Sequence, residues 1–343
     1  MEEKKILKND LEYIFFKIKP LINDLKDKTF FITGGTGFFG KWILSTITYL
    51  NEFHDLNIKA YVLSRDPKTF IDKHPFLNNN YLEFIEGDVN KILNFDIEFD
   101  YCIHAATEAS QKLNSENPEV MLKTIIDGTF NVFDLCLKSF CSSALITSSG
   151  GVYGKMSDCK QICESDIGTL NLQHIDSTYS EGKRVQELIA KIYEEKHRMQ
   201  ISIARCFAFL GPYLPLNTHF AAGNFIKNAI EGEDIIINGD GSPVRTYMYA
   251  ADLVIALFWI LIKGESCSPY NVGGQDPVSI RDLAFQVSQF SPKNIKAKIL
   301  QKEKLNLNRS YYVPSIKKLS DLIPSYSQLS LSESIKRTVN WYI

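Results

Sequence analysis

Short apolar runs alternate along the chain with longer segments that carry apolar residues at helical spacing. The runs are rich in β-branched and aromatic side chains, and each ends at a polar or glycine-containing turn. They cover residues 29–32, 60–63, 81–85, 101–106, 144–149 and 201–205. Several are apolar throughout, which is typical of parallel strands covered by helices on both faces. The pattern therefore predicts an α/β protein with a doubly wound parallel sheet.

The same pattern predicts how the chain is divided. Apolar residues at helical spacing precede the first strand, so residues 1–27 are expected to form a helical extension. Beyond Phe209, prolines, a stretch rich in Asn and Gly, and short helical segments indicate a smaller lobe. We expect the sheet domain to comprise residues 28–208 with about 242–275, and the smaller C-terminal lobe to comprise residues 209–241 and 276–343.

Composition narrows the class of protein. Of the 343 residues, 45% are apolar and 23% are charged, which is ordinary for a globular protein. The formal charge of −2 provides no basic field for nucleic acid. The longest apolar stretch, residues 253–262, is shorter than the ~18 residues of a membrane span. Because the charged N-terminus also lacks a secretory signal, we expect a cytoplasmic protein with no nucleic-acid or membrane partner.

Cysteine and histidine show no metal-binding pattern. The seven cysteines are scattered, and Cys159 and Cys163 are separated by three residues without accompanying histidines. The six histidines show neither H-x-x-x-H nor H-E-x-x-H spacing. We therefore expect reduced thiols and no metal site.

A glycine-rich turn follows the first predicted strand. Residues 35, 37 and 40 spell G-x-G-x-x-G, while 34, 37 and 40 spell G-x-x-G-x-x-G. Such glycines let the backbone bend sharply and lie against a pyrophosphate, and the following helix offers N–H groups to the anion. Between a strand and a helix near the start of an α/β chain, the motif predicts a Rossmann-type dinucleotide site. The alternative is a purely structural turn.

Tyr179 and Lys183 lie four residues apart at the start of a predicted helix, so both side chains face the same way. A nearby ammonium favours phenolate and should lower the pKa of the tyrosine towards neutrality, which suits an acid or base. Ser148 and Ser149 end the fifth strand, where a hydroxyl could bind a substrate oxygen and share its proton with Tyr179. The alternatives are a decorative Tyr–Lys pair on a helix surface and serines that only cap the turn.

Further motifs follow in order along the chain. They are Gly87-Asp88-Val89, His104-Ala105-Ala106, Ser148-Ser149 with Val152-Tyr153-Gly154, Gly211-Pro212, Gly239-Asp240-Gly241 with Arg245, and Tyr270-Asn271-Val272-Gly273. Together with the glycine turn and the Tyr–Lys pair, they cover roughly residues 28–343. In these motifs the chain resembles the extended short-chain dehydrogenase/reductases, in their NAD(P)-dependent nucleotide-sugar epimerase, dehydratase and reductase branch.

The resemblance implies a role for each motif. Asp88 would hydrogen-bond the adenine, and the catalytic residues would be Ser149, Tyr179 and Lys183. A nucleotide-diphosphate sugar would bind to Ser149, Gly150, Asn224 and Arg245. A guanidinium suits the diphosphate, although Arg245 could instead form a surface ion pair. The dinucleotide would bind to Gly34, Gly37, Phe38, Phe39, Gly40, Ser64, Arg65, Asp88, Val89, Ala105, Ala106, Thr107, Tyr179 and Lys183. A homodimer through the helices near 118–140 and 180–197 is also implied.

One departure from the family pattern bears on the reaction. In the family's 4,6-dehydratases, a threonine is followed by an Asp-Glu pair that removes water across C5 and C6. Here Ser149 is followed by Gly150 and Gly151, which cannot transfer protons. Glu108 could substitute only if the fold brought it to this turn. Chemistry centred on the sugar C4 is therefore expected.

A second departure bears on the cofactor. Where NAD-preferring folds carry an acidic residue at the end of the second strand, this chain has Ser64 followed by Arg65. Loss of the carboxylate and gain of a cation favour NADP(H), with NAD(H) possible because Asp66 follows. We therefore expect a 4-ketoreductase of a nucleotide-linked (deoxy)hexose. The alternatives are a C4 epimerase with tightly bound NAD and, less favoured, a 4,6-dehydratase or a non-catalytic dinucleotide sensor.

Overall fold

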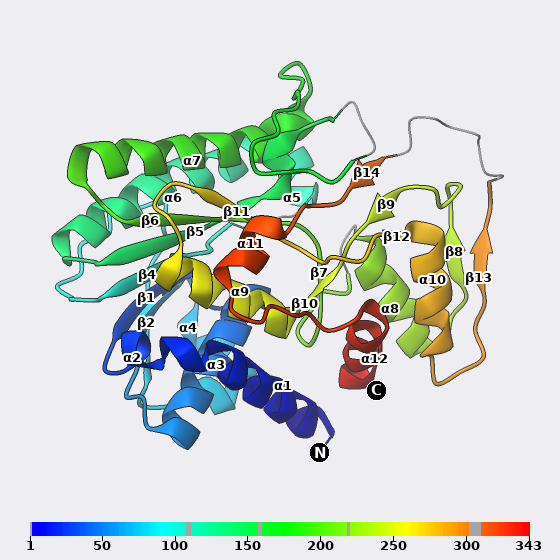
Figure 1. The fold of residues 1–343 in the computed structure, drawn as a ribbon, viewed down its shortest axis with the longest axis horizontal. Coiled ribbons are helices and arrows are strands. Elements are labelled where there is room, and N and C mark those ends of the chain that lie inside the picture. The colour runs from blue at the N-terminus through cyan, green and yellow to red at the C-terminus, as the bar shows by residue number, and fades with distance from the viewer. Residues whose placement is uncertain (1, 108–110, 157–159, 218–219, 302–309) are drawn as a thin grey trace.

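A seven-stranded parallel sheet forms the centre of the protein. The computed structural model describes residues 2–107, 111–156, 160–217, 220–301 and 310–343 (Figure 1). Strand order is β11-β6-β5-β4-β1-β2-β3, and every neighbouring pair is parallel. The strands are β1 (Thr29–Thr33), β2 (Lys59–Ser64), β3 (Leu82–Glu86), β4 (Tyr101–His104), β5 (Ser143–Ser149), β6 (Ile201–Cys206) and β11 (Pro269–Val272).

This sheet confirms the predicted fold class. The six apolar runs correspond to β1 to β6, while β11 was recognised only as a motif and not as a strand. Strand order reverses between β1 and β4, and ligands of doubly wound sheets bind at the carboxyl ends of the strands beside such a switch point. We therefore expect a ligand to bind beside the residues that follow β1 and β4.

Helices cover both faces of the sheet. On one face lie α6 (Pro118–Lys138) and α7 (Thr178–His197), and on the other lie α3 (Phe38–His54) and α9 (Ala250–Lys263) (Figure 1). The glycine turn passes directly into α3, which begins at Phe38. Shorter helices are η1 (Lys19–Leu21), α2 (Ile22–Leu25), α4 (Pro67–Lys73), η2 (Pro75–Leu77), α5 (Gln111–Glu116), η3 (Gly150–Tyr153), η4 (Ile175–Ser177) and α11 (Lys317–Leu322).

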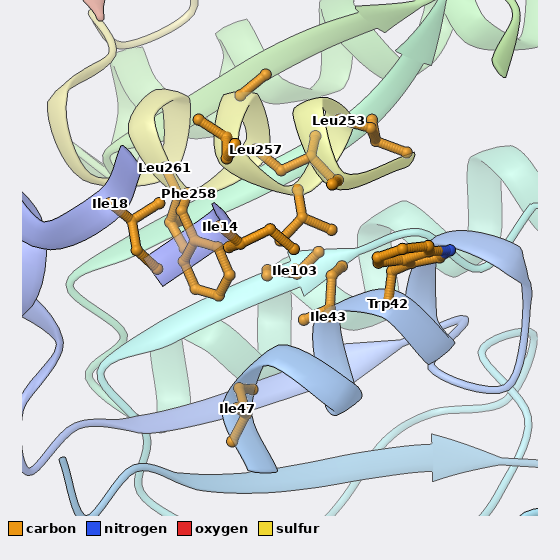
Figure 2. Close-up of a cluster of buried hydrophobic side chains, with 14 of the residues drawn as sticks. Ile14, Ile18, Trp42, Ile43, Ile47, Ile103, Leu253, Leu257, Phe258 and Leu261 are labelled. Atoms are coloured by element: carbon orange, nitrogen blue, oxygen red, sulfur yellow. The ribbon is translucent and has the colours of Figure 1, made fainter. Parts of the chain in front are cut away.

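The N-terminal extension packs against the main body of the protein. Helix α1 (Glu2–Ile18) contacts α9, α3 and the last helix, α12 (Leu331–Tyr342). Figure 2 shows Ile14 and Ile18 of α1 beside Leu257, Phe258 and Leu261 of α9. Each fully buried isoleucine contributes about 2 kcal/mol of hydrophobic stabilisation. The extension is therefore an integral part of the apolar core on this face.

The C-terminal residues form small sheets and three further helices. The sheets pair β7 (Phe209–Leu210) with β10 (Met248–Tyr249), β8 (Ile235–Ile237) with β13 (Ala297–Ile299), and β9 (Val244–Arg245) with β12 (Val278–Ser279) and β14 (Tyr311–Tyr312). Helices α8 (Ala221–Glu231), α10 (Ile280–Gln289) and α12 enclose a separate apolar cluster. Figure 1 shows these elements beside the carboxyl edge of the large sheet.

Three further observations concern the described part of the chain. None of its helices has the length and apolarity that crossing a bilayer would require. Its six cysteines form no disulfide, and Cys159 lies outside the described residues. Within the same residues, no group of three or more His, Cys, Asp or Glu is arranged to hold a metal ion.

Candidate functional site

The glycine turn after β1 has the geometry of a dinucleotide cradle. Gly34 has a φ of 72°, and a Cβ atom there would lie 2.3 Å from the Ala105 carbonyl oxygen. A Cβ at Gly40 would lie 2.3 Å from the backbone of Gly35. Gly37 precedes the first turn of α3, whose free N–H groups and dipole favour an anion. The turn thus requires its glycines and fits a pyrophosphate.

The loop after β4 lies against this turn. Ala105 and Ala106 are the neighbours that a Cβ on Gly34 would meet, so the turn and the loop are in direct contact. The Thr107 hydroxyl is buried and has no hydrogen-bond partner within the described residues. Because buried polar groups are normally satisfied, an unpaired hydroxyl here fits a site built for a polar ligand. Both observations agree with the predicted cofactor-lining positions.

Asp88 and Val89 follow β3 at the same edge of the sheet. Asp88 accepts hydrogen bonds from the backbone and side chain of Asn90 through one carboxylate oxygen, Oδ1. Val89 is buried, and its carbonyl oxygen accepts a 2.7 Å hydrogen bond from Asn131. A fixed loop with a half-buried carboxylate can recognise an adenine amine, which is the role that the family resemblance implies for Asp88.

Residues at the end of β2 are expected to contact the 2′ position of the cofactor's ribose. Ser64 is buried and accepts a 3.2 Å hydrogen bond from the Asp66 N–H. Asp66 caps α4 by accepting a 3.0 Å hydrogen bond from the Thr69 N–H. Arg65 is exposed. The Asp66 carboxylate, which weakened the NADP prediction, is therefore hydrogen-bonded at the start of α4, while the Arg65 side chain is exposed.

The two serines at the end of β5 have different surroundings. Ser148 is buried and donates a 2.5 Å hydrogen bond to Glu187, which forms an ion pair with Arg205 on β6. Ser149 is half-buried, and its hydroxyl accepts a 3.0 Å hydrogen bond from the Gly151 N–H. Ser149 therefore caps the turn, and its hydroxyl also lies near Tyr179, so its role in catalysis stays a prediction.

Tyr179 lies in the first turn of α7 and is half-buried. Its backbone N–H donates a 3.0 Å hydrogen bond to Asn114. Burial raises the pKa of the Tyr179 phenol to about 12, although a hydrogen bond with Ser149 acts in the opposite direction. This differs from the expectation that Lys183 lowers the pKa, because desolvation of the phenolate dominates and the opposing influence is the Ser149 hydrogen bond. Without ligands, Tyr179 is therefore a protonated phenol at neutral pH.

Lys183 is 2% exposed and lies one helical turn beyond Tyr179. Its ammonium is 5.9 Å from the centroid of the Tyr179 ring and donates hydrogen bonds to the Thr147 carbonyl oxygen at 2.7 Å and to Gln186 at 2.9 Å. Burial lowers the pKa of Lys183 to about 8, so it is still cationic at neutral pH. The Tyr–Lys pair therefore faces inward from α7 rather than decorating its surface.

Arg245 on β9 and Tyr312 on β14 approach this cluster from a small three-stranded sheet. Their strands, β9 and β14, are paired in register, and the Arg245 guanidinium lies 5.6 Å from the centroid of the Tyr312 ring. Within the described residues, Arg245 donates to the carbonyl oxygens of Val244 and Ser310 and forms no ion pair. Burial lowers its pKa. Among the described residues, Arg245 therefore does not form the surface ion pair that was the alternative interpretation.

Tyr312 is a site residue that the sequence analysis missed. A Cβ on Gly150 would lie 2.2 Å from the Tyr312 hydroxyl and 2.8 Å from the ring of Phe207. Burial raises the pKa of Tyr312, and a hydrogen bond with Ser149 opposes that rise. No local motif surrounds Tyr312, and its proximity to Ser149 arises only from the pairing of β14 with β9. The remaining predicted residue, Asn224, is exposed in the first turn of α8, and its role stays a prediction.

Comparisons with known proteins agree with this architecture. Residues 30–273 match the profile described as "NAD dependent epimerase/dehydratase family". UDP-glucuronic acid decarboxylase 5 of Arabidopsis thaliana is 30% identical over 272 residues, covering 79% of this chain and 76% of the relative.

Two solved structures have the same fold. One is the UDP-N-acetylglucosamine 4-epimerase of Methanobrevibacter ruminantium M1, with a TM-score of 0.76, 22% identity and coverage of 92% of this chain and 98% of that one. The other is the dTDP-glucose 4,6-dehydratase DesIV of Streptomyces venezuelae with NAD bound, with a TM-score of 0.76, 21% identity and coverage of 92% and 96%. The chain belongs to the NAD-dependent epimerase/dehydratase family of nucleotide-sugar-modifying enzymes.

Proposed function

We propose that this protein is an NADP(H)-dependent 4-ketoreductase acting on a nucleotide-linked (deoxy)hexose. The observation that carries the proposal is the turn after Ser149. A side chain at position 150 would meet Tyr312 and Phe207, and a Cβ at position 151 would lie 2.7 Å from the Ser180 hydroxyl. The turn therefore has neither an acid–base residue nor space for one. Glu108, the conceivable substitute, lies outside the described residues.

The proposed proton donor is Tyr179. Bound NADPH would supply a hydride to the carbonyl carbon at C4 of the sugar. As that bond forms, the C4 oxygen gains negative charge and takes the phenolic proton of Tyr179. The raised pKa supports this direction, because a phenol that stays protonated at neutral pH is ready to donate. Ser149 would hold the same oxygen, and the Lys183 cation would stabilise the phenolate that results.

Arg245 is the proposed ligand of the substrate's diphosphate. Its guanidinium is partly withdrawn from solvent, stacks over Tyr312 and has no acidic partner within the described residues. A cation in this state is suited to bind an anion, because the desolvation cost is already met by the fold. Asn224 is assigned to the same ligand by family resemblance alone.

The cofactor preference is proposed from the end of β2. The exposed Arg65 could pair with a 2′-phosphate, and the Asp66 carboxylate is engaged as the N-cap of α4. Neither feature favours the 2′-hydroxyl of NAD, which would donate a hydrogen bond to an acidic residue. The family's usual cofactor is NAD, so NADP(H) marks a specific expected difference of this chain.

A C4 epimerase with tightly bound NAD is the second candidate. The likeness to a solved UDP-N-acetylglucosamine 4-epimerase favours it, since the same phenol and hydroxyl could serve oxidation and reduction at C4. The two activities differ in cofactor exchange. A reductase must release NADP after each turnover, whereas an epimerase retains its cofactor.

Product analysis tests the proposal directly. The purified protein is incubated with NADPH or NADH and a panel of UDP-, GDP-, CDP- and dTDP-linked 4-keto sugars, and the products are identified by mass spectrometry. We expect a mass gain of two hydrogens with stoichiometric loss of NADPH absorbance. Copurified NAD and conversion of a 4-hydroxy sugar to its C4 epimer would instead identify the epimerase.

Substitution of Tyr179 tests the assignment of the donor. Tyr179→Phe keeps the ring and removes the proton, so turnover should fall by roughly 10²-fold or more while dinucleotide affinity changes little. Unchanged turnover would remove Tyr179 from the mechanism. Arg198→Ala, at the distant C-terminal cap of the same helix, serves as the control and should retain activity.

We also propose that the protein forms a homodimer through α6 and α7. The outward side chains Val120 and Phe130 on α6, with Leu188 and Ile192 on α7, are exposed and apolar. The two helices pack against each other, so their outer faces could form one surface. Light scattering after size-exclusion chromatography should give twice the chain mass, and Leu188→Glu should reduce it to one chain.

A further inference from the structure

The Lys183 ammonium donates its hydrogen bonds to neutral groups, and burial lowers its pKa while Cys206 and Glu187 act in the opposite direction. It is buried, and none of the described carboxylates forms an ion pair with it. Two of its three N–H groups point to oxygen atoms, one from the Thr147 backbone and one from Gln186. The position of this ammonium beside Tyr179 therefore depends on hydrogen bonds whose geometry the protein must fix.

The amide of Gln186 can adopt only one orientation. Its Nε2 donates a 2.9 Å hydrogen bond to the Thr129 hydroxyl oxygen, while Oε1 accepts from Lys183. Thr129 donates its single proton to the Ile125 carbonyl oxygen at 2.6 Å, so towards Gln186 it can act only as an acceptor. A flipped amide would direct its N–H groups at the Lys183 ammonium and its carbonyl oxygen at the Thr129 hydroxyl oxygen. Both partners therefore fix the carbonyl towards Lys183.

This chain of contacts continues to the glycine turn. His104 is buried, with Nε2 3.4 Å from the Thr129 hydroxyl and Nδ1 2.7 Å from the Thr33 hydroxyl. Burial, and then the nearby Lys183 cation, lower the pKa of His104 to about 3, so the ring stays neutral. Thr33 immediately precedes Gly34. One buried network thus connects α7 and α6 with the ends of β4 and β1.

We propose that Gln186 is a positioning residue, which holds the Lys183 ammonium beside Tyr179 and ties it through Thr129 and His104 to the turn that would carry the dinucleotide. The inference rests on the proposed hydride-transfer function. Gln186 touches neither the proposed substrate nor the phenol, and it acts through Lys183. Its carbonyl stabilises the cation in place.

Two substitutions separate positioning from packing. Gln186→Met keeps the length and volume of the side chain but removes the acceptor, so the charged form of Lys183 loses a hydrogen bond and its pKa should fall. Gln186→Glu keeps an acceptor and adds a negative charge, so the pKa of Lys183 should rise. If Gln186 only filled space, the pKa of Lys183 would be the same in Gln186→Met as in the wild type.

Activity provides the first readout, with the keto sugar that the wild type reduces. We expect Gln186→Met to lower kcat by on the order of 10-fold, the cost of one hydrogen bond to a charged group, with KM unchanged within about twofold. The alkaline limb of the pH–rate profile should move to lower pH in Gln186→Met and to higher pH in Gln186→Glu. Gln200→Met, a change of the same kind beyond the end of α7, should match the wild type.

Nuclear magnetic resonance provides a second readout that needs no substrate. The protein is labelled with ¹³Cε-lysine, the Lys183 signal is assigned with Lys183→Met, and its titration is followed in each Gln186 variant. Opposite displacements of the midpoint support the proposal, even if no tested sugar is reduced. A midpoint that is the same in all three proteins, in folded samples with matching melting temperatures, would overturn it. Failure of the reductase assay alone would overturn only the proposed function.

Should Gln186→Met fail to fold, Thr129→Ala replaces it in both measurements. That change removes the acceptor that orients the amide while leaving Gln186 in place. The titration midpoint of Lys183 should then fall, but by less than in a variant that lacks the Gln186 carbonyl. An unchanged midpoint in this variant would contradict the proposed connection through Thr129.

Discussion

The Tyr249 hydroxyl donates a 2.6 Å hydrogen bond to the buried carboxylate of Asp10, 239 residues earlier in the chain. Arg337 of α12 forms an ion pair with the same carboxylate. One acid on the N-terminal helix is thus bound both to the strand that precedes α9 and to the last helix of the chain. Burial raises the pKa of Asp10 to about 6 in spite of these partners, with Glu333 also contributing to the rise.

This raised pKa predicts a specific pH dependence of stability. The folded protein binds the Asp10 proton more tightly than the unfolded chain, whose carboxyl has a pKa of 3.8. The stability contribution of Asp10 is therefore fully present below about pH 3.8 and is lost as the pH rises to about 6. Relative to Asp10→Asn, which cannot titrate, the wild-type free energy of unfolding should fall by ~3 kcal/mol across this window.

Urea unfolding between pH 4 and pH 7 measures this difference. The matched control is Glu12→Gln, which removes an exposed carboxyl from the same helix and so measures the effect of losing a surface charge alone. If the difference between wild type and Asp10→Asn rose with pH instead, the buried carboxyl would be stabilised by Arg337 more than it is penalised by burial.

The cradle geometry predicts the effect of Gly34→Ala. The new Cβ would meet the Ala105 carbonyl oxygen at 2.3 Å, and the backbone there is left-handed, so the loop after β4 must shift. Affinity for NADPH, measured by calorimetry, should fall at least 10-fold. Gly232→Ala is the control, because it has a φ of 74° but meets a flexible Lys293 side chain. It should lose stability and retain affinity; equal losses of affinity would contradict the assignment of the cradle.

Local sequence was sufficient for part of this site. The glycine turn and the Tyr179–Lys183 pair each lie within a few residues, and alternation of strands and helices predicts that strand ends share one edge. Tyr312 was not predictable in the same way, because only the pairing of β14 with β9 brings it to Gly150. The docking of Asp10 against Tyr249 is equally non-local. The pKa of Tyr179 was misjudged because burial depends on the complete tertiary structure.

The cofactor proposal predicts a selective effect at Arg65. Arg65→Ser removes the cation at the end of β2, so the dissociation constant of NADPH should rise about 10-fold while that of NADH stays within about twofold. Lys59→Ala, which removes an exposed cation at the opposite end of the same strand, should change neither. An equal rise in the dissociation constants of both dinucleotides would show that Arg65 does not bind the 2′-phosphate.

The contact between Gly150 and Tyr312 predicts a double-mutant result. Gly150→Ala introduces a Cβ 2.2 Å from the Tyr312 hydroxyl and 2.8 Å from the Phe207 ring, and the backbone at this residue is not left-handed, so displacement of these two side chains is the main consequence. We expect kcat/KM to fall at least 10-fold. Tyr312→Phe removes the clashing oxygen, so adding it to Gly150→Ala should recover part of that loss. Strictly additive losses would mean that the two residues act independently, because a shared steric conflict requires the second substitution to relieve the first.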